Sequence, residues 1–174
     1  MRKINAAISL ITTALLLEHA IFLAVRMLSQ GEIPRQPAVL SWTLAFAVWA
    51  HATISLAIAF ASHKKARRAA VKGYAKLNRQ TLVQRISGVL MLVLVPLHVA
   101  GTTGLMNPPK IIHAVSPILF FTVALAHVAV SASKAFITLG IGNARFIKAT
   151  DLIVKIICAL TFAAALTGFY LFGV

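Results

Sequence analysis

The stretch LVQRISGVLMLVLVPLHVAGTTGL, residues 82–105, decides the fold of this chain. It is almost entirely apolar and carries one histidine, His98, well inside the run. About 20 apolar residues are enough for an α-helix to cross the hydrocarbon core of a bilayer. An ionisable side chain inside such a helix is costly, so His98 indicates a functional site by default.

Four more stretches of this kind predict an all-α membrane protein. The five predicted helices form one bundle in a single integral membrane domain, residues 1–174, and run over residues 4–28, 38–61, 82–105, 112–137 and 152–172. The composition agrees, with 60% hydrophobic and 11% charged residues and a mean hydropathy of +0.90. Each of the first four helices carries one central histidine: His19, His51, His98 and His127.

The basic residues predict how the bundle is oriented. The net charge of +14 comes from short clusters between apolar runs, which excludes a nucleic-acid-binding surface. Of the 17 Lys and Arg residues, all but Arg26, Arg35 and Lys110 fall on the side of the N-terminus. The positive-inside rule then places the N-terminus in the cytoplasm and the C-terminus outside, in a multi-pass protein of the cell (inner or cytoplasmic) membrane that contacts membrane lipid.

The histidines fall into two pairs by depth. With a rise of about 1.5 Å per residue, His19 and His98 lie roughly 22–24 Å from the inner boundary, and His51 and His127 about 15 Å from it. Paired intramembrane imidazoles on facing helices suit the axial positions of two b-type haems, an outer and an inner one. The single cysteine, Cys158, forms no CxxCH motif, so these haems would be bound non-covalently.

The residues around the histidines suggest how a haem would be held. Gln84 and Ser87 share the His98 face of their helix and are expected to line the interior beside the inner haem or a quinone. Gly88 lies at the edge of that face, where a missing side chain would make room for a macrocycle. Arg85 points about 140° away and would have to snorkel to reach a propionate or a partner subunit.

Two more basic residues lie two helical turns from a histidine. Arg26 follows His19 towards the outer surface, and Lys134 follows His127 towards the inner surface. Each could pair with a haem propionate. The alternative is that both snorkel to lipid headgroups, as basic residues at helix ends often do.

The run Gln84-Arg85-Ile86-Ser87-Gly88, followed by His98, resembles the third helix of a five-helix cytochrome b. That cytochrome is the membrane anchor of succinate dehydrogenase and quinol:fumarate reductase. The resemblance implies that helices one and three share one haem, and that helices two and four share the other. It also implies electron transfer to or from a quinone, with flavoprotein and iron–sulfur partner subunits on the cytoplasmic face. The basic segment 64–79 is a plausible docking surface for them. No GxGxxG motif or cysteine set occurs here, so no dicarboxylate site is expected on this chain.

Other readings of the histidines remain open. A dihaem cytochrome b of another membrane oxidoreductase would use the same four ligands. A non-haem transporter or metal carrier could also use intramembrane histidines, although more than three acidic residues would be expected of it. Glu18 could relay protons or be a structural carboxyl. His113 could be a surface residue or a neighbour of a quinone or propionate, and Asp151 is predicted to cap the fifth helix.

Overall fold

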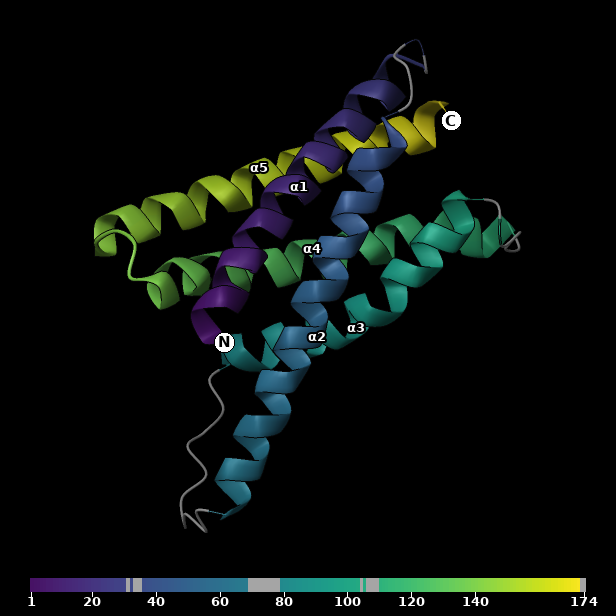
Figure 1. Ribbon diagram of the computed structural model, residues 1–174. Coiled ribbons are helices and arrows are strands. Elements are labelled where there is room, and N and C mark those ends of the chain that lie inside the picture. The colour runs from purple at the N-terminus through teal and green to yellow at the C-terminus, as the bar shows by residue number, and fades with distance from the viewer. Residues whose placement is uncertain (31, 33–35, 69–78, 104, 106–109, 173–174) are drawn as a thin grey trace.

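The computed structural model describes the backbone of residues 1–30, 32, 36–68, 79–103, 105 and 110–172 (Figure 1). Across these residues the chain is helical, with turns and no strands. The helices are α1 (Arg2–Leu28), α2 (Ala38–Arg68), α3 (Arg79–Thr102), α4 (Lys110–Leu139) and α5 (Ala144–Phe172). Each contains a segment that is long and apolar enough to cross a membrane. The prediction of five such helices is therefore confirmed.

The helices extend beyond the apolar runs from which they were predicted. Helix α2 continues to Arg68, and α5 begins at Ala144 instead of near Leu152, whereas α3 ends at Thr102, before residue 105. An apolar run marks the part of a helix that suits hydrocarbon, but a helical backbone satisfies its own hydrogen bonds and can continue into polar surroundings. Hydrophobicity alone therefore misplaced these ends.

The turn between α4 and α5 shows what ends one helix and begins the next. Gly140 has a φ of +74°, a backbone conformation that glycine adopts without strain. Its N–H donates to the Ile137 carbonyl at 3.1 Å, and the Ile141 N–H donates to the Phe136 carbonyl at 3.1 Å. This pair of bonds is a Schellman cap.

The start of α5 corrects one sequence-based expectation. The side-chain oxygen of Asn143 accepts a hydrogen bond from the Phe146 N–H at 2.9 Å, so Asn143 caps the helix. Asp151, predicted as the cap, lies inside α5 and forms an ion pair with Lys155. The prediction for Asp151 was wrong because Gly140 and Asn143, which are stop and start signals, were not used.

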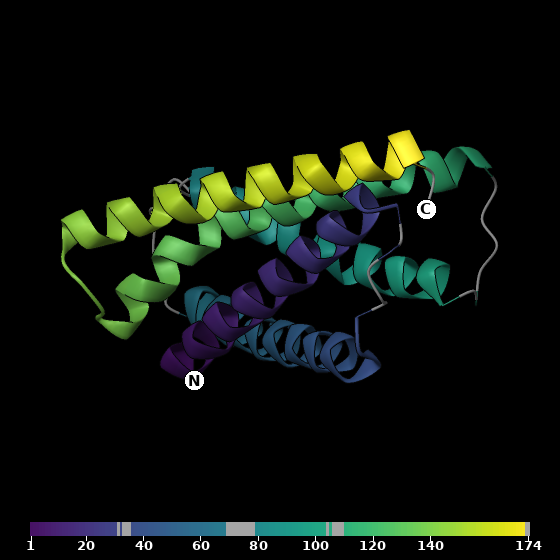
Figure 2. The ribbon, with the colours of Figure 1, turned by 90° about the horizontal axis from the view of Figure 1, so that it is seen from above.

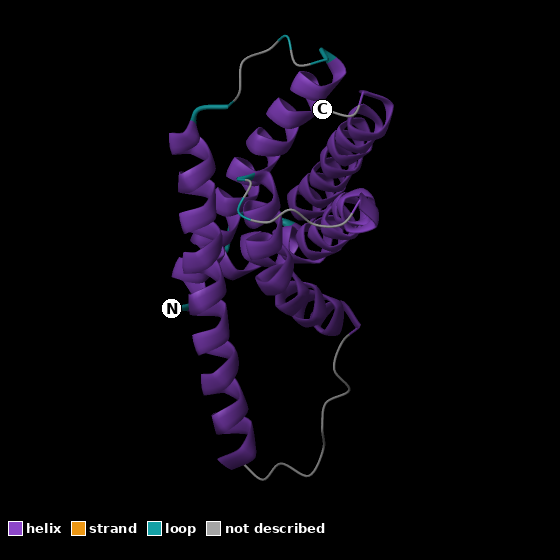
Figure 3. Cartoon of the chain, turned by 90° about the vertical axis from the view of Figure 1, so that its right-hand side faces the viewer, coloured by secondary structure: helices purple, strands orange, loops and turns teal. Residues whose placement is uncertain are grey.

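Helix α1 lies at the centre of the packing. It packs against α2, α4 and α5, and α4 packs against α3 and α5. Figure 2 shows α1 between α2 and the neighbouring pair α4 and α5, while Figure 3 shows α2 at the edge of the molecule. The main core is formed where α1, α4 and α5 meet, by Ala20, Ala24, Phe120, Phe121, Ala124, Phe162 and Ala165. Small residues let the helix backbones approach, and the phenylalanines fill the remaining space.

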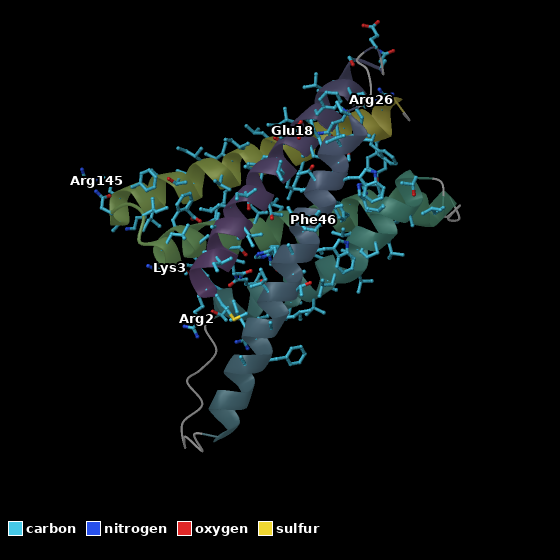
Figure 4. The ribbon with its side chains drawn as sticks, viewed as in Figure 1. Arg2, Lys3, Glu18, Arg26, Phe46 and Arg145 are labelled. Carbon is cyan, nitrogen blue, oxygen red and sulfur yellow. The ribbon has the colours of Figure 1, made fainter. Side chains whose placement is uncertain are left out.

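The basic residues gather at the ends of the bundle as their sequence positions suggest. Figure 4 shows Arg2, Lys3 and Arg145 towards one end, and Arg26 towards the other. This grouping is the one that the predicted orientation requires. Which end faces the cytoplasm stays a prediction from the positive-inside rule.

The contact between α1 and α5 yields a test of the fold. A Cβ atom built on Gly168 would lie 2.6 Å from the Met27 Cβ and 3.3 Å from the Met27 carbonyl carbon. We expect Gly168→Ala to force α1 and α5 apart and to destabilise the protein by about 1–3 kcal/mol. Unfolding in mixed detergent micelles measures this change.

Gly101 provides the matched control for this substitution. A Cβ atom at Gly101 of α3 would meet nothing within 4 Å among the described residues. Gly101→Ala should leave stability unchanged or raise it slightly, because alanine favours helix more than glycine does. Equal stability of the two variants would contradict the close α1–α5 contact.

Candidate functional site

The structure brings His51 of α2 and His127 of α4 together. Their ring centroids are 6.4 Å apart, and the ring planes are inclined at 69°. An imidazole nitrogen bound to a transition metal lies about 2 Å from it, so two rings on opposite sides of one metal have centroids roughly 6 Å apart. The spacing of this inner pair therefore suits two axial ligands of one metal ion.

Residues of α3 enclose the His127 ring from one side. The Ser87 hydroxyl oxygen lies 3.0 Å from the His127 Nδ1. A Cβ atom on Gly88 would lie 3.2 Å from the His127 Cε1, so the absent side chain leaves room for the imidazole itself. Ser87, which is 5% exposed, and Gly88 thus lie beside the His127 ring.

Two buried polar atoms at the inner pair have no hydrogen-bond partner. They are the His51 Nδ1 and the hydroxyl oxygen of Ser131, one helical turn beyond His127, and among the described residues no other buried side-chain nitrogen or oxygen is left in this state. An unpaired buried polar atom costs about 1–3 kcal/mol. Native structures rarely accept that cost, so such atoms indicate a site for a ligand or water.

A positively charged cluster lies beyond the inner pair. The Lys134 ammonium donates to the Gln84 side-chain oxygen at 2.9 Å and to the Thr81 hydroxyl at 3.3 Å. Both partners are uncharged, and the guanidinium of Arg85 is close enough to interact electrostatically with Lys134. Excess positive charge at this position suits an anionic group such as a carboxylate.

The outer pair is organised differently. His19 of α1 and His98 of α3 are close enough to interact electrostatically. The Gln36 amide donates to both carboxylate oxygens of Glu18, at 2.8 and 2.9 Å. Its carbonyl oxygen can only accept, so the His19 Nδ1, 2.6 Å away, is the donor of that bond. The His98 ring stacks on Phe120, with centroids 4.6 Å apart and planes inclined at 11°.

Gln36 and Phe120 were not recognised from the sequence. Gln36 lies in the connection before α2, and Phe120 is one of several phenylalanines of the chain. Each contacts its histidine only because separate segments of the chain converge, so no spacing in the sequence predicts these contacts. Arg26 is half-buried towards the outer end of α1 (Figure 4).

Several other sequence-based expectations fall outside the described residues. The basic segment 64–79, proposed as a docking loop, begins as the last turns of α2, and residues 69–78 are not described. The side chains of Lys110 and His113 are not described either.

At the inner site two histidines meet, without a larger cluster of metal-binding side chains. In the described part of the chain, no three His, Cys, Asp or Glu side chains gather to hold a metal ion by themselves. Two histidines suffice for a haem iron, because the macrocycle supplies the other donors. The donor set and the two unpaired buried atoms therefore fit a haem at the inner pair.

Fold and site together define a class: within its described residues, a helical chain with five apolar helices of membrane-spanning length and a pair of histidine rings that meet between two helices. Comparison of the chain with protein-family models, with curated proteins and with solved structures gives no match.

Proposed function

We propose that this chain is a dihaem cytochrome b membrane anchor. It carries electrons between a quinone pool and a peripheral flavoprotein and iron–sulfur oxidoreductase of the succinate dehydrogenase or fumarate reductase type. The observation that carries the proposal is the inner histidine pair, His51 and His127. Its ring spacing of 6.4 Å and its unpaired buried atoms suit an interhelical ligand.

Each haem would have two histidine ligands from two different helices. In the described structure, the two helices of each such pair do not pack closely against each other along their lengths. His51 and His127 would hold the inner haem between α2 and α4, and His19 and His98 the outer one between α1 and α3. When bound, a haem supplies reversible one-electron transfer. The surrounding apolar helices keep water from the imidazoles and separate the two pairs within the membrane.

The charged residues would neutralise the haem propionates. Lys134, with Arg85 nearby, is the candidate at the inner haem, and Arg26 is the candidate at the outer haem. Gln84 would then be shared between Lys134 and a propionate or quinone. The opposite-charge contact compensates the cost of holding a cation partly away from water.

Haem stoichiometry tests this proposal directly. The full chain, purified in mild detergent, is expected to carry about two haems b that are extracted by acid acetone, as a pyridine-haemochrome assay would measure. His63→Ala is the matched control and should retain both haems, because this histidine does not belong to either pair. A chain without haem, although expressed in cells that make haem, would refute the proposal.

The same preparation distinguishes the remaining alternatives. Co-purification of flavin and iron–sulfur proteins, with haem reduction by succinate or by a quinol, supports the succinate dehydrogenase or fumarate reductase type. Haem reduction by another donor, with other partners, indicates a dihaem cytochrome b of a different oxidoreductase.

A further inference from the structure

We infer that Ser87 is a positioning residue that holds His127 in the tautomer with a proton on Nδ1, which leaves Nε2 as the nitrogen that binds metal. The identity of that metal, a haem iron, rests on the proposed function. The tautomer itself does not, because it follows from contacts between α3 and α4.

The Ser87 hydroxyl has a single proton to donate. Its oxygen lies 2.7 Å from the Val83 carbonyl oxygen, 3.3 Å from the Gln84 carbonyl oxygen and 3.0 Å from the His127 Nδ1. Carbonyl oxygens only accept, and two oxygens at 2.7 Å repel each other unless a proton lies between them. The Ser87 proton is therefore donated to Val83.

The direction of the second bond follows from the first. With its proton committed, the Ser87 oxygen can only accept from the ring, so the His127 Nδ1 carries a proton and donates it. A neutral imidazole has one protonated nitrogen, so Nε2 holds the free lone pair. Metal-binding histidines commonly use the other ring N–H in this way, which fixes the tautomer and makes the ligand more basic.

The space around the ring restricts it further. The His127 Cε1 lies 3.2 Å from where a Gly88 Cβ would be, so the ring rests against the α3 backbone beside Ser87. His51 differs, because its buried Nδ1 has no hydrogen-bond partner. The His127 ring also interacts with the backbone of Gln84, and the His51 ring with the backbone of Asn5. The inner pair thus has one ring whose Nδ1 is held by a side chain, that of Ser87, and one ring whose Nδ1 is not.

The first test measures the tautomer in the full chain. Ring nitrogen NMR shifts of ¹⁵N-histidine-labelled protein, with His127 assigned from its loss in His127→Gln, should show a protonated Nδ1 in the wild type. Ser87→Thr keeps the hydroxyl and should keep this signal, whereas Ser87→Ala should shift the ring towards a mixture of tautomers. A wild-type His127 protonated on Nε2 would overturn the inference, and so would an unchanged tautomer in Ser87→Ala.

The second test uses the haem as a reporter. Ser87→Ala should weaken retention of one haem by about 10–100-fold and raise its midpoint potential, because a less basic imidazole stabilises oxidised iron less. Thr13→Ala is the matched control, since the Thr13 hydroxyl also bonds a carbonyl in its own helix, that of Ser9 at 2.9 Å. Unchanged retention and potential in Ser87→Ala would overturn the positioning role. A wild-type chain without haem would refute the proposed function, while the tautomer measurement still decides the role of Ser87.

Discussion

Replacing either His51 or His127 with alanine is expected to remove one and the same haem, so that haem per chain falls to about half and the outer haem remains. Replacing His19 or His98 should remove the other haem. The physical reason is that a haem held by two axial imidazoles from two helices loses half of its protein ligands when one is truncated. Redox titration of the visible spectrum, resolved into two components, measures which one is lost.

Double variants test directly which histidines share a haem. His51→Ala combined with His127→Ala should lose no more haem than either single variant, since both ligands serve one site. His51→Ala combined with His19→Ala should lose both haems. Helical content by circular dichroism controls for misfolding. Loss of different components in the His51 and His127 variants would contradict the pairing.

The second large effect is expected at Gly88. A Cβ there would lie 3.2 Å from the His127 Cε1, and the two methyl groups of valine extend further into the same space. We therefore expect Gly88→Val to displace the imidazole and to abolish binding of the inner haem, while Gly88→Ala weakens it. Haem content and the inner-haem component of the redox titration measure both variants.

The control for Gly88 lies in the same helix. Gly101→Val adds the same side chain to α3 at a position where a Cβ meets nothing within 4 Å among the described residues. It should leave the inner haem in place, so a general effect of valine on α3 is separated from the local effect on His127. Retention of the inner haem in Gly88→Val would show that the ring has room to move.

The contacts at the inner end of α3 were predicted from the sequence only in part. Gln84, Ser87 and Gly88 were expected at the inner end of their helix, facing the interior. The helical period alone places them on one face, because residues three and four apart lie above one another. Their partners on α4 were not predicted in detail: Ser87 and Gly88 contact His127, and Gln84 contacts Lys134.

The amino-acid sequence by itself determined the five helices and the one central histidine in each of the first four. It did so because apolar length and the cost of a buried imidazole are properties of each segment taken alone. Only the tertiary structure decided that the rings of His51 and His127 lie 6.4 Å apart, that Gln36 bonds His19, and that Phe120 stacks on His98. These contacts depend on how the helices rotate and cross, and that depends on interhelical packing such as that of Gly168 of α5 on Met27 of α1.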